Sequence, residues 1–199
     1  MKINQHESII GKSCILVPYC SKHVQKYHGW MENEELLIAT SSEPLTLVEE
    51  YEMQKKWQDS DKLTFIILDK QTFEAAGDDE IGSMAGDVNA FICQQNEDEE
   101  PTTFEISVMV AEQKYRNKGI AKEACLLIIN YILKRINSAS NFIAKISLNN
   151  KSSISLFKKL GFEEESFSDV FQLFTFKLKN CEAKKIEEIQ KELKIVYYI

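Results

Sequence analysis

Positive charge is scarce in this chain of 199 residues. Lysine and arginine number 24 against 31 aspartates and glutamates, which gives a formal net charge of −7 at pH 7. Proteins that bind nucleic acid need clustered cations against the phosphates. We therefore expect no nucleic-acid-binding surface, although one local anion site is compatible with this balance. Apolar residues make up 44% and charged residues 28% of the chain, as in ordinary globular proteins and unlike disordered ones.

Long apolar runs, glycine and proline are scarce as well. The most apolar segment, residues 124–133, is interrupted by Asn130 and is too short to span a bilayer. Seven glycines and three prolines provide no linker that would divide the chain. We expect a single domain over residues 1–180, followed by a tail over residues 181–199. Residues 1–7 lack the apolar stretch of a secretory signal, so we expect a cytoplasmic protein, with the nucleus as the alternative.

Histidines are few, and the cysteines are not paired in the sequence. The five cysteines are odd in number and include no Cys-x-x-Cys pair, which favours reduced thiols inside a cell. Cys14, Cys20, His23 and His28 lie close in the sequence, but their spacing fits no zinc-finger pattern, so we predict no metal site. With three histidines and no nucleophile elbow, a Ser/His/Asp hydrolase is not indicated either.

The apolar pattern predicts an α/β fold. We expect a mixed, mostly antiparallel sheet of about six or seven strands, flanked by about four helices. The predicted strands are residues 13–19, 63–69, 84–93, 104–111, 142–148, 162–167 and 170–178. The predicted helices are residues 21–31, 47–57, 119–131 and 150–160. The tail has apolar residues at helical spacing among lysines and glutamates, which predicts an amphipathic helix over residues 182–199 that docks on the domain or on a partner.

Residues 116–121 lie between a predicted buried strand and an amphipathic helix. A helix start offers unpaired N–H groups and the positive end of the helix dipole, so it binds anions. Gly119 lets the backbone approach a phosphate closely, small Ala121 keeps the helix start open, and Arg116 and Lys118 add positive charge. Neither the P-loop nor the dinucleotide fingerprint is present. The alternative is an ordinary loop with solvated cations.

A second motif follows at residues 150–162, where a helix that starts at Asn150 carries Phe157 and ends in Leu160-Gly161-Phe162. In this order and on these elements, the two motifs resemble the signatures of the GCN5-related N-acetyltransferase (GNAT) superfamily. Further stretches within residues 1–178 resemble the N-acetyltransferase 9 family within it, among them residues 11–19, 42–46, 86–89 and 142–146.

The resemblance implies that the fourth and fifth strands, residues 104–111 and 142–148, splay apart and take acetyl-CoA between them. The pantetheine arm would pair with the fourth strand as an added strand. The N–H of Val110 would polarise the thioester carbonyl, and Asn150 would contact the cofactor or the incoming substrate. The positions implied in cofactor binding are Val110, Ala111, Arg116, Asn117, Lys118, Gly119, Ile120, Ala121, Asn150 and Phe157.

The implied reaction is direct attack of a neutral amine on the thioester. Because amines are mostly protonated at neutral pH, a general base is useful. Glu105 on the fourth strand is the candidate base, the alternative being a surface carboxylate with no role in the chemistry. Phe157 stands where many members carry a tyrosine that protonates the leaving thiolate, and phenylalanine has no proton to give. Either another group is the acid or the thiolate leaves unassisted.

The helical region between the first two predicted strands would wall the acceptor site. The candidates there are Trp30, Glu34, Glu35, Glu43 and Trp57, since acidic residues suit a cationic amine. The alternative is packing tryptophans and solvated glutamates. The resemblance implies a protein or peptide acceptor, through an N-terminal α-amine or a lysine. A CoA-binding scaffold without catalysis and an acetyltransferase for small amines such as polyamines stay open.

Overall fold

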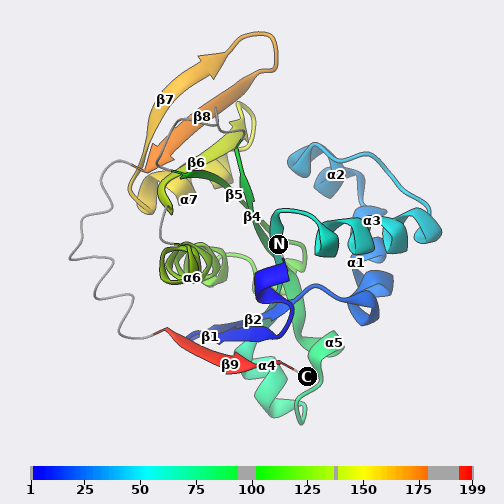
Figure 1. Cartoon of the computed structure of the whole chain (residues 1–199). Helices are drawn as coiled ribbons and strands as arrows, with labels where there is room; N and C mark the ends of the chain where they lie inside the picture. Colours follow the sequence, from blue (N-terminus) through cyan, green and yellow to red (C-terminus); the bar gives the residue numbers. More distant parts are fainter. Residues whose placement is uncertain (1, 94–101, 137–138, 179–192, 199) are drawn as a thin grey trace.

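The structure is a computed structural model that describes residues 2–93, 102–136, 139–178 and 193–198. One sheet crosses these residues in the order β7-β8-β6-β5-β4-β3-β2-β1-β9 (Figure 1). Neighbouring strands are antiparallel except for the parallel pair β5–β6. The strands are β1 (Glu7–Ile10), β2 (Cys14–Pro18), β3 (Lys62–Asp69), β4 (Met84–Ile92), β5 (Thr102–Val110), β6 (Ala139–Ser147), β7 (Phe162–Ser168), β8 (Leu173–Leu178) and β9 (Lys194–Tyr197).

Helices cover both faces of this sheet (Figure 1). Two of them, α6 (Ile120–Arg135) and α7 (Lys151–Lys159), pack on one face. The other face carries α1 (Val24–Met31), α2 (Glu34–Thr40), α3 (Leu47–Asp59), α4 (Lys70–Ala75) and α5 (Glu80–Ser83). Single 3-10 turns lie at η1 (Lys2–Asn4), η2 (Ser21–His23) and η3 (Gln113–Tyr115). This arrangement confirms the predicted α/β class with a mixed, mostly antiparallel sheet.

The central strand β3 shows why a continuous apolar run formed here. Alternate residues of a strand point to opposite faces, and both faces of β3 are covered. Phe65 and Ile67 pack in the core under α6, whereas Ile66 and Leu68 pack against the helices of the other face. All four side chains are fully buried, as expected for a strand whose two faces are both covered.

The helices predicted over residues 47–57 and 150–160 begin where expected, and each start is capped. The Thr46 and Glu49 capping box at the start of α3 is present, with the Thr46 N–H donating to Glu49 Oε2 at 2.8 Å. Asn150 caps α7 by accepting from the Ser153 N–H at 3.1 Å. Gly161 follows α7 with φ +91°, the left-handed conformation that glycine adopts most easily.

Two short strands, β1 and β9, were not predicted, and β9 lies where a helix was predicted. Residues 194–197 form β9, which pairs along β1 from Glu7↔Tyr197 to Ile10↔Lys194. The helix predicted over residues 182–199 is therefore wrong at residues 194–197. Ile195, Val196 and Tyr197 are β-branched or aromatic and favour a strand where an edge is available. The rest of that prediction, with its docking role, falls largely on residues 179–192, which lie outside the described residues.

Residues 70–83, where the sequence predicts neither a strand nor a helix, contain α4 and α5. Each begins after an aspartate whose side chain caps it. Asp69 Oδ1 accepts from the Thr72 N–H at 2.8 Å, and Asp79 Oδ1 accepts from the Gly82 N–H at 2.9 Å. Both helices are too short for the apolar period to show in the sequence.

Candidate active site

Strands β5 and β6 are paired at one end only. Their partner residues run from Thr102↔Ala139 to Glu105↔Ile143. Beyond Glu105, β5 continues to Val110 while β6 keeps pairing with β8 as far as Ser147. The predicted splay of these two strands is therefore confirmed, and it leaves the far half of β5 without a partner on that side.

The backbone of Val110 faces this opening. The Ala111 N–H donates to Ala85 O on the β4 side at 2.9 Å, and successive residues of a strand direct their N–H and C=O groups to opposite sides. The groups of Val110 therefore point away from β4. Its carbonyl accepts from Arg116 Nε at 3.0 Å, which agrees with that direction. The Val110 N–H points into the opening, as an oxyanion contact would require.

Residues 116–121 form a tight turn into α6. Asn117 and Gly119 both have positive φ, +60° and +82°. Gly119 is the N-cap of α6, and the first helical bond runs from the Glu123 N–H to Gly119 O at 3.0 Å. A Cβ at Gly119 would meet no atom within 4 Å. Asn117, Lys118 and Gly119 are exposed, so the amides at this helix start are accessible to an anion.

The last two predicted loop residues differ in burial. Ile120 is 2% exposed and anchors the helix start in the core, whereas Ala121 is half-buried beside the turn. That small Ala121 keeps the helix start open for an anion stays a prediction.

Arg116 is held by the protein rather than extended into solution. Besides Val110 O, its guanidinium donates to Ala111 O at 3.4 Å and lies 3.5 Å from Glu35 Oε1 on α2. These partners leave its charge close to the turn but direct its N–H groups to the end of β5. Arg116 thus joins the end of β5 to α2, a contact that its place in the sequence does not reveal.

Asn150 and Phe157 are engaged within the fold. Asn150 Oδ1 accepts from the Ser153 N–H and from Ser152 Oγ at 2.9 Å, so its oxygen is used as a helix cap. Phe157 is 2% exposed and packs edge-on against Phe162 with ring centroids 5.0 Å apart. Their contact with a cofactor stays a prediction.

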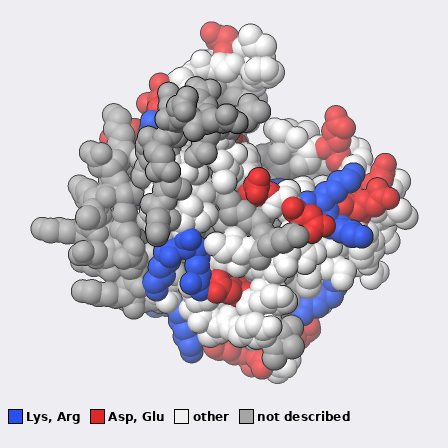
Figure 2. All heavy atoms as spheres, in the orientation of Figure 1, with Lys and Arg blue, Asp and Glu red and all other residues white. Residues whose placement is uncertain are grey.

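The predicted acceptor wall divides into a buried tryptophan and exposed carboxylates. Trp30 is 8% exposed, and its Nε1–H donates to Glu112 Oε1 at 2.9 Å, which fastens α1 to the turn after β5. Glu34, Glu35 and Glu43 are exposed on and after α2. In the face shown in Figure 2, acidic and basic side chains are interspersed over α3.

Glu105 lies at the paired end of β5, not at the opening. Its carboxylate forms an ion pair with Lys145 on β6 at 2.9 Å. Five residues separate it from Val110, about 17 Å along an extended strand. This distance and this partner do not favour Glu105 as the base.

Two polar residues of β4 lie on the face under α1 and α3. They were not among the site residues predicted from the sequence. Asp87 is 3% exposed and Asn89 is 6% exposed. Asn89 Nδ2 donates to Asp87 Oδ2 at 2.5 Å, and Thr64 Oγ1 on β3 donates to Asn89 Oδ1 at 2.8 Å. Two polar residues at alternate positions of a buried strand are a signal that the sequence does contain.

Burial raises the pKa of Asp87 to about 6, although Lys62 and the hydrogen bond from Asn89 work in the opposite direction. Lys62 lies on the same face, 3.0 Å above the Trp57 ring centre, and burial lowers its pKa to about 8. Strongly shifted groups of this kind gather at functional sites.

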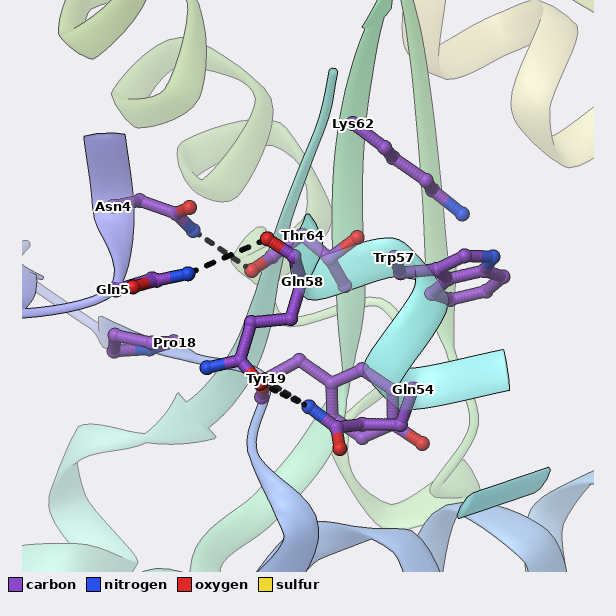
Figure 3. A pocket seen from close by; sticks show the side chains of 9 residues that line it. All are labelled: Asn4, Gln5, Pro18, Tyr19, Gln54, Trp57, Gln58, Lys62 and Thr64. Carbon is purple, nitrogen blue, oxygen red and sulfur yellow. Dashed lines mark hydrogen bonds between the residues drawn. The ribbon is translucent and has the colours of Figure 1, made fainter. Parts of the chain in front are cut away.

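A small cavity lies beside this polar row, between η1, the end of β2 and α3 (Figure 3). Its volume is about 20 Å³, enough for one water molecule and far too small for a cofactor or peptide. Tyr19, Trp57 and Lys62 line it, and Gln54 Nε2 donates to Tyr19 O across it at 3.1 Å. It is a packing gap rather than the acceptor site.

Two features are absent from the part of the chain that the structure describes. No group of three or more histidine, cysteine, aspartate or glutamate side chains there could hold a metal ion. Over the same part of the chain, no helix has the length and apolarity needed to cross a bilayer.

Known proteins match this chain over most of its length. The family model described as an acetyltransferase (GNAT) domain matches residues 14–163. An N-acetyltransferase 9-like protein of Nematostella vectensis is 46% identical over 178 residues, which cover 89% of this chain and 88% of the relative. The α/β-tubulin-N-acetyltransferase 9 of Mus musculus is 45% identical over 187 residues, covering 93% of this chain and 76% of that protein.

Solved structures share the fold at low identity. A GNAT-family acetyltransferase from Bacillus anthracis aligns with a TM-score of 0.66 at 16% identity, over 85% of this chain and 96% of its own. The spermidine N-acetyltransferase of Vibrio cholerae, in complex with CoA and spermine, aligns with a TM-score of 0.65 at 16% identity, over 84% and 94% of the two chains. By its family match and its identity to these relatives, the chain belongs to the GNAT family and is an N-acetyltransferase.

Proposed function

We propose that this enzyme transfers the acetyl group of acetyl-CoA to an amine of a protein, and that tubulin is a substrate. The observation that carries the proposal is the opening between β5 and β6 beside the accessible amides of residues 117–119. The names of the mouse, human and fly relatives, which are 44–45% identical, supply the tubulin substrate.

The residues around the opening fit the parts of acetyl-CoA. The diphosphate would rest on the N–H groups of residues 117–121, where helix start and positive φ expose them. The pantetheine arm would pair with the unpartnered side of β5. The Val110 N–H, which points into the opening, would stabilise the charge that builds on the thioester oxygen.

Arg116 has a positioning role in this proposal. By holding the carbonyls of Val110 and Ala111, its guanidinium fixes the end of β5 and so the direction of the Val110 N–H. Its ion pair with Glu35 also couples this end of the strand to the acceptor wall.

The thiolate of CoA would leave without a tyrosine acid. Phe157 has no proton to give, but a thiol with a pKa near 8.5 is a tolerable leaving group at neutral pH. Asn150 Nδ2, on the side chain whose oxygen caps α7, is the group there that could contact the cofactor.

The acceptor would approach from the face covered by α1–α3. Exposed Glu34, Glu35 and Glu43 would attract the ammonium group of a protein N-terminus or lysine as it arrives. Acetylation of tubulin would place the enzyme in the cytoplasm. A polyamine is the second candidate acceptor, because spermine occupies a protein of the same fold.

Cofactor binding is tested by melting. We expect acetyl-CoA at a hundredfold excess over Kd to stabilise the protein by about 2.7 kcal/mol. Gly119→Val should abolish this shift, since its side chain would cover the amides. Gly29→Val is the matched control, because Gly29 lies in α1 with open space around it and no positive φ; it should keep the shift.

Turnover is tested by the release of free CoA thiol with purified tubulin, followed by mass spectrometry of the acetylated tubulin. The modified residue decides between an α-amine and a lysine. Binding of acetyl-CoA without thiol release on tubulin, peptides or spermidine would instead indicate a scaffold that has lost catalysis.

A further inference from the structure

An amine acceptor must lose a proton before it attacks. Lysine has a pKa near 10.4 and an α-amine near 8, so the group arrives mostly as an ammonium ion at neutral pH. This inference rests on the proposed function: if amines are the acceptors, a proton acceptor has to lie near Val110 on the face covered by α1 and α3.

Asp87 is a buried carboxylate on the strand next to that position. In the β4–β5 register its Cα partner is Met109, the residue directly before Val110. Glu105, by contrast, is partnered with Phe91 at the other end of β5 and is neutralised by Lys145.

Within the described residues, one oxygen of the Asp87 carboxylate accepts a hydrogen bond, and the other does not. Oδ2 accepts from Asn89, whose amide is itself oriented by Thr64. Oδ1 is buried and has no hydrogen-bond partner among the described residues. Buried polar atoms are nearly always satisfied, so this oriented carboxylate keeps one oxygen that can accept a hydrogen bond from an incoming amine.

Aromatic rings gather over the same face. The Tyr19 ring centre lies 5.1 Å from that of Tyr27 and 6.1 Å from that of Trp57, and Tyr27 and Trp57 are 6.4 Å apart. Ring faces attract ammonium groups, above all where water is excluded. The Lys62 ammonium over Trp57 shows that this cluster accepts a cation.

We propose that Asp87 is the general base of the reaction and accepts a proton from the acceptor ammonium through Oδ1. The neutral amine then forms the N–C bond to the thioester carbonyl carbon, whose π electrons move to the oxygen. Collapse breaks the C–S bond, and CoA leaves as the thiolate with that electron pair. The thiolate takes the proton that the new amide nitrogen loses, and Asp87 returns its proton to solvent.

The basicity of Asp87 suits this role. With a pKa of about 6, it is ionised at neutral pH yet more basic than an ordinary aspartate, as an efficient base should be. The titratable groups that surround it are Lys62 from β3, Tyr19 after β2, Tyr27 from α1 and Glu50 from α3. Burial raises the pKa of both tyrosines above their usual 10, so neither titrates near pH 6.

Glu50 is a second group whose titration could affect the pH dependence of the activity. Burial raises its pKa as well, while His28, 3.6 Å away, opposes the shift. The experiment therefore compares Asp87→Asn with Glu50→Gln and Glu105→Gln. Asp69→Asn is the matched control, since Asp69 is a buried aspartate of β3 whose capping role asparagine can take over.

We expect Asp87→Asn to lower kcat with tubulin about 100-fold or more at pH 7 and to leave the melting shift with acetyl-CoA unchanged. The deficit should shrink as the pH approaches the pKa of the amine, where the acceptor is already neutral. A structural role would not produce this recovery. The acidic limb near pH 6 in kcat/KM should persist in Asp69→Asn, Glu50→Gln and Glu105→Gln.

Two results would overturn the inference: activity of Asp87→Asn within a fewfold of wild type at pH 7, or loss of the acidic limb in Glu105→Gln or Glu50→Gln instead. If the wild type does not acetylate tubulin, the proposed substrate fails. The same four variants are then compared on spermidine or on peptide amines that the wild type acetylates. This comparison tests the role of Asp87 independently of tubulin as the substrate.

Discussion

The buried carboxylate of Asp87 should make the folded protein less stable at neutral pH than a neutral side chain would. The folded group titrates near pH 6, whereas an unfolded aspartate titrates near 3.8. Between these values the folded chain holds a proton that the unfolded chain has released. Stability therefore falls as the pH rises through this window and is constant above it, as far as Asp87 is concerned.

The magnitude follows from the difference between the two pKa values. About two units correspond to about 3 kcal/mol at most. Asparagine is the neutral isostere of the protonated form and still offers an oxygen to Asn89. We therefore expect Asp87→Asn to unfold at a higher temperature than wild type at pH 7.5, by up to about 6–12 °C for a domain of this size.

The assay is thermal denaturation without ligands at pH 7.5 and at pH 4, where both proteins carry a neutral group at this position. The two melting temperatures should converge at the lower pH. Lower stability of Asp87→Asn at pH 7.5, or an equal difference at both values, would refute the reasoning. A variant that is more stable but less active would mark a site at which stability is sacrificed for function.

Three further predictions concern the backbone. Gly86→Ala would place a Cβ 1.9 Å from Met109 O, so β4 and β5 must move apart. We expect a lower melting temperature and slower turnover. A variant with unchanged melting temperature and turnover would disprove the close contact. Gly119→Ala adds a side chain at φ +82°, a strain of about 1–2 kcal/mol, measurable by urea denaturation against Gly29→Ala. Deleting residues 194–199 uncovers the β1 edge, and we expect aggregation in light scattering; a stable monomer would count against it.

The parts of the site that local sequence encodes were predictable. Gly119 and Asn117 are residue types that tolerate positive φ, so the turn into α6 could be expected from residues 116–121 alone. The capping signals of Thr46 and Asn150 likewise marked real helix starts. The splay of β5 from β6 came from family resemblance, since no local pattern reports where two strands separate.

What the sequence could not show depended on neighbours far along the chain. The ion pair of Glu105 could not be predicted, because its partner Lys145 lies forty positions away on another strand. The importance of Asp87 depends on Asn89 nearby and on Thr64 and the aromatic cluster elsewhere. The strand at residues 194–197 needed the open edge of β1 to override a helical apolar pattern.

The pairing of β1 with β9 has a consequence for synthesis of the chain. Residues 194–197, the outer neighbours of residues 7–10, leave the ribosome only after more than 180 further residues have been made. Until then Ile9, which is fully buried in the finished protein, sits on an edge that any other extended polypeptide can occupy. Nascent copies of this enzyme should thus depend on chaperones for longer than a protein in which such a strand pairs only with strands close to it in the sequence.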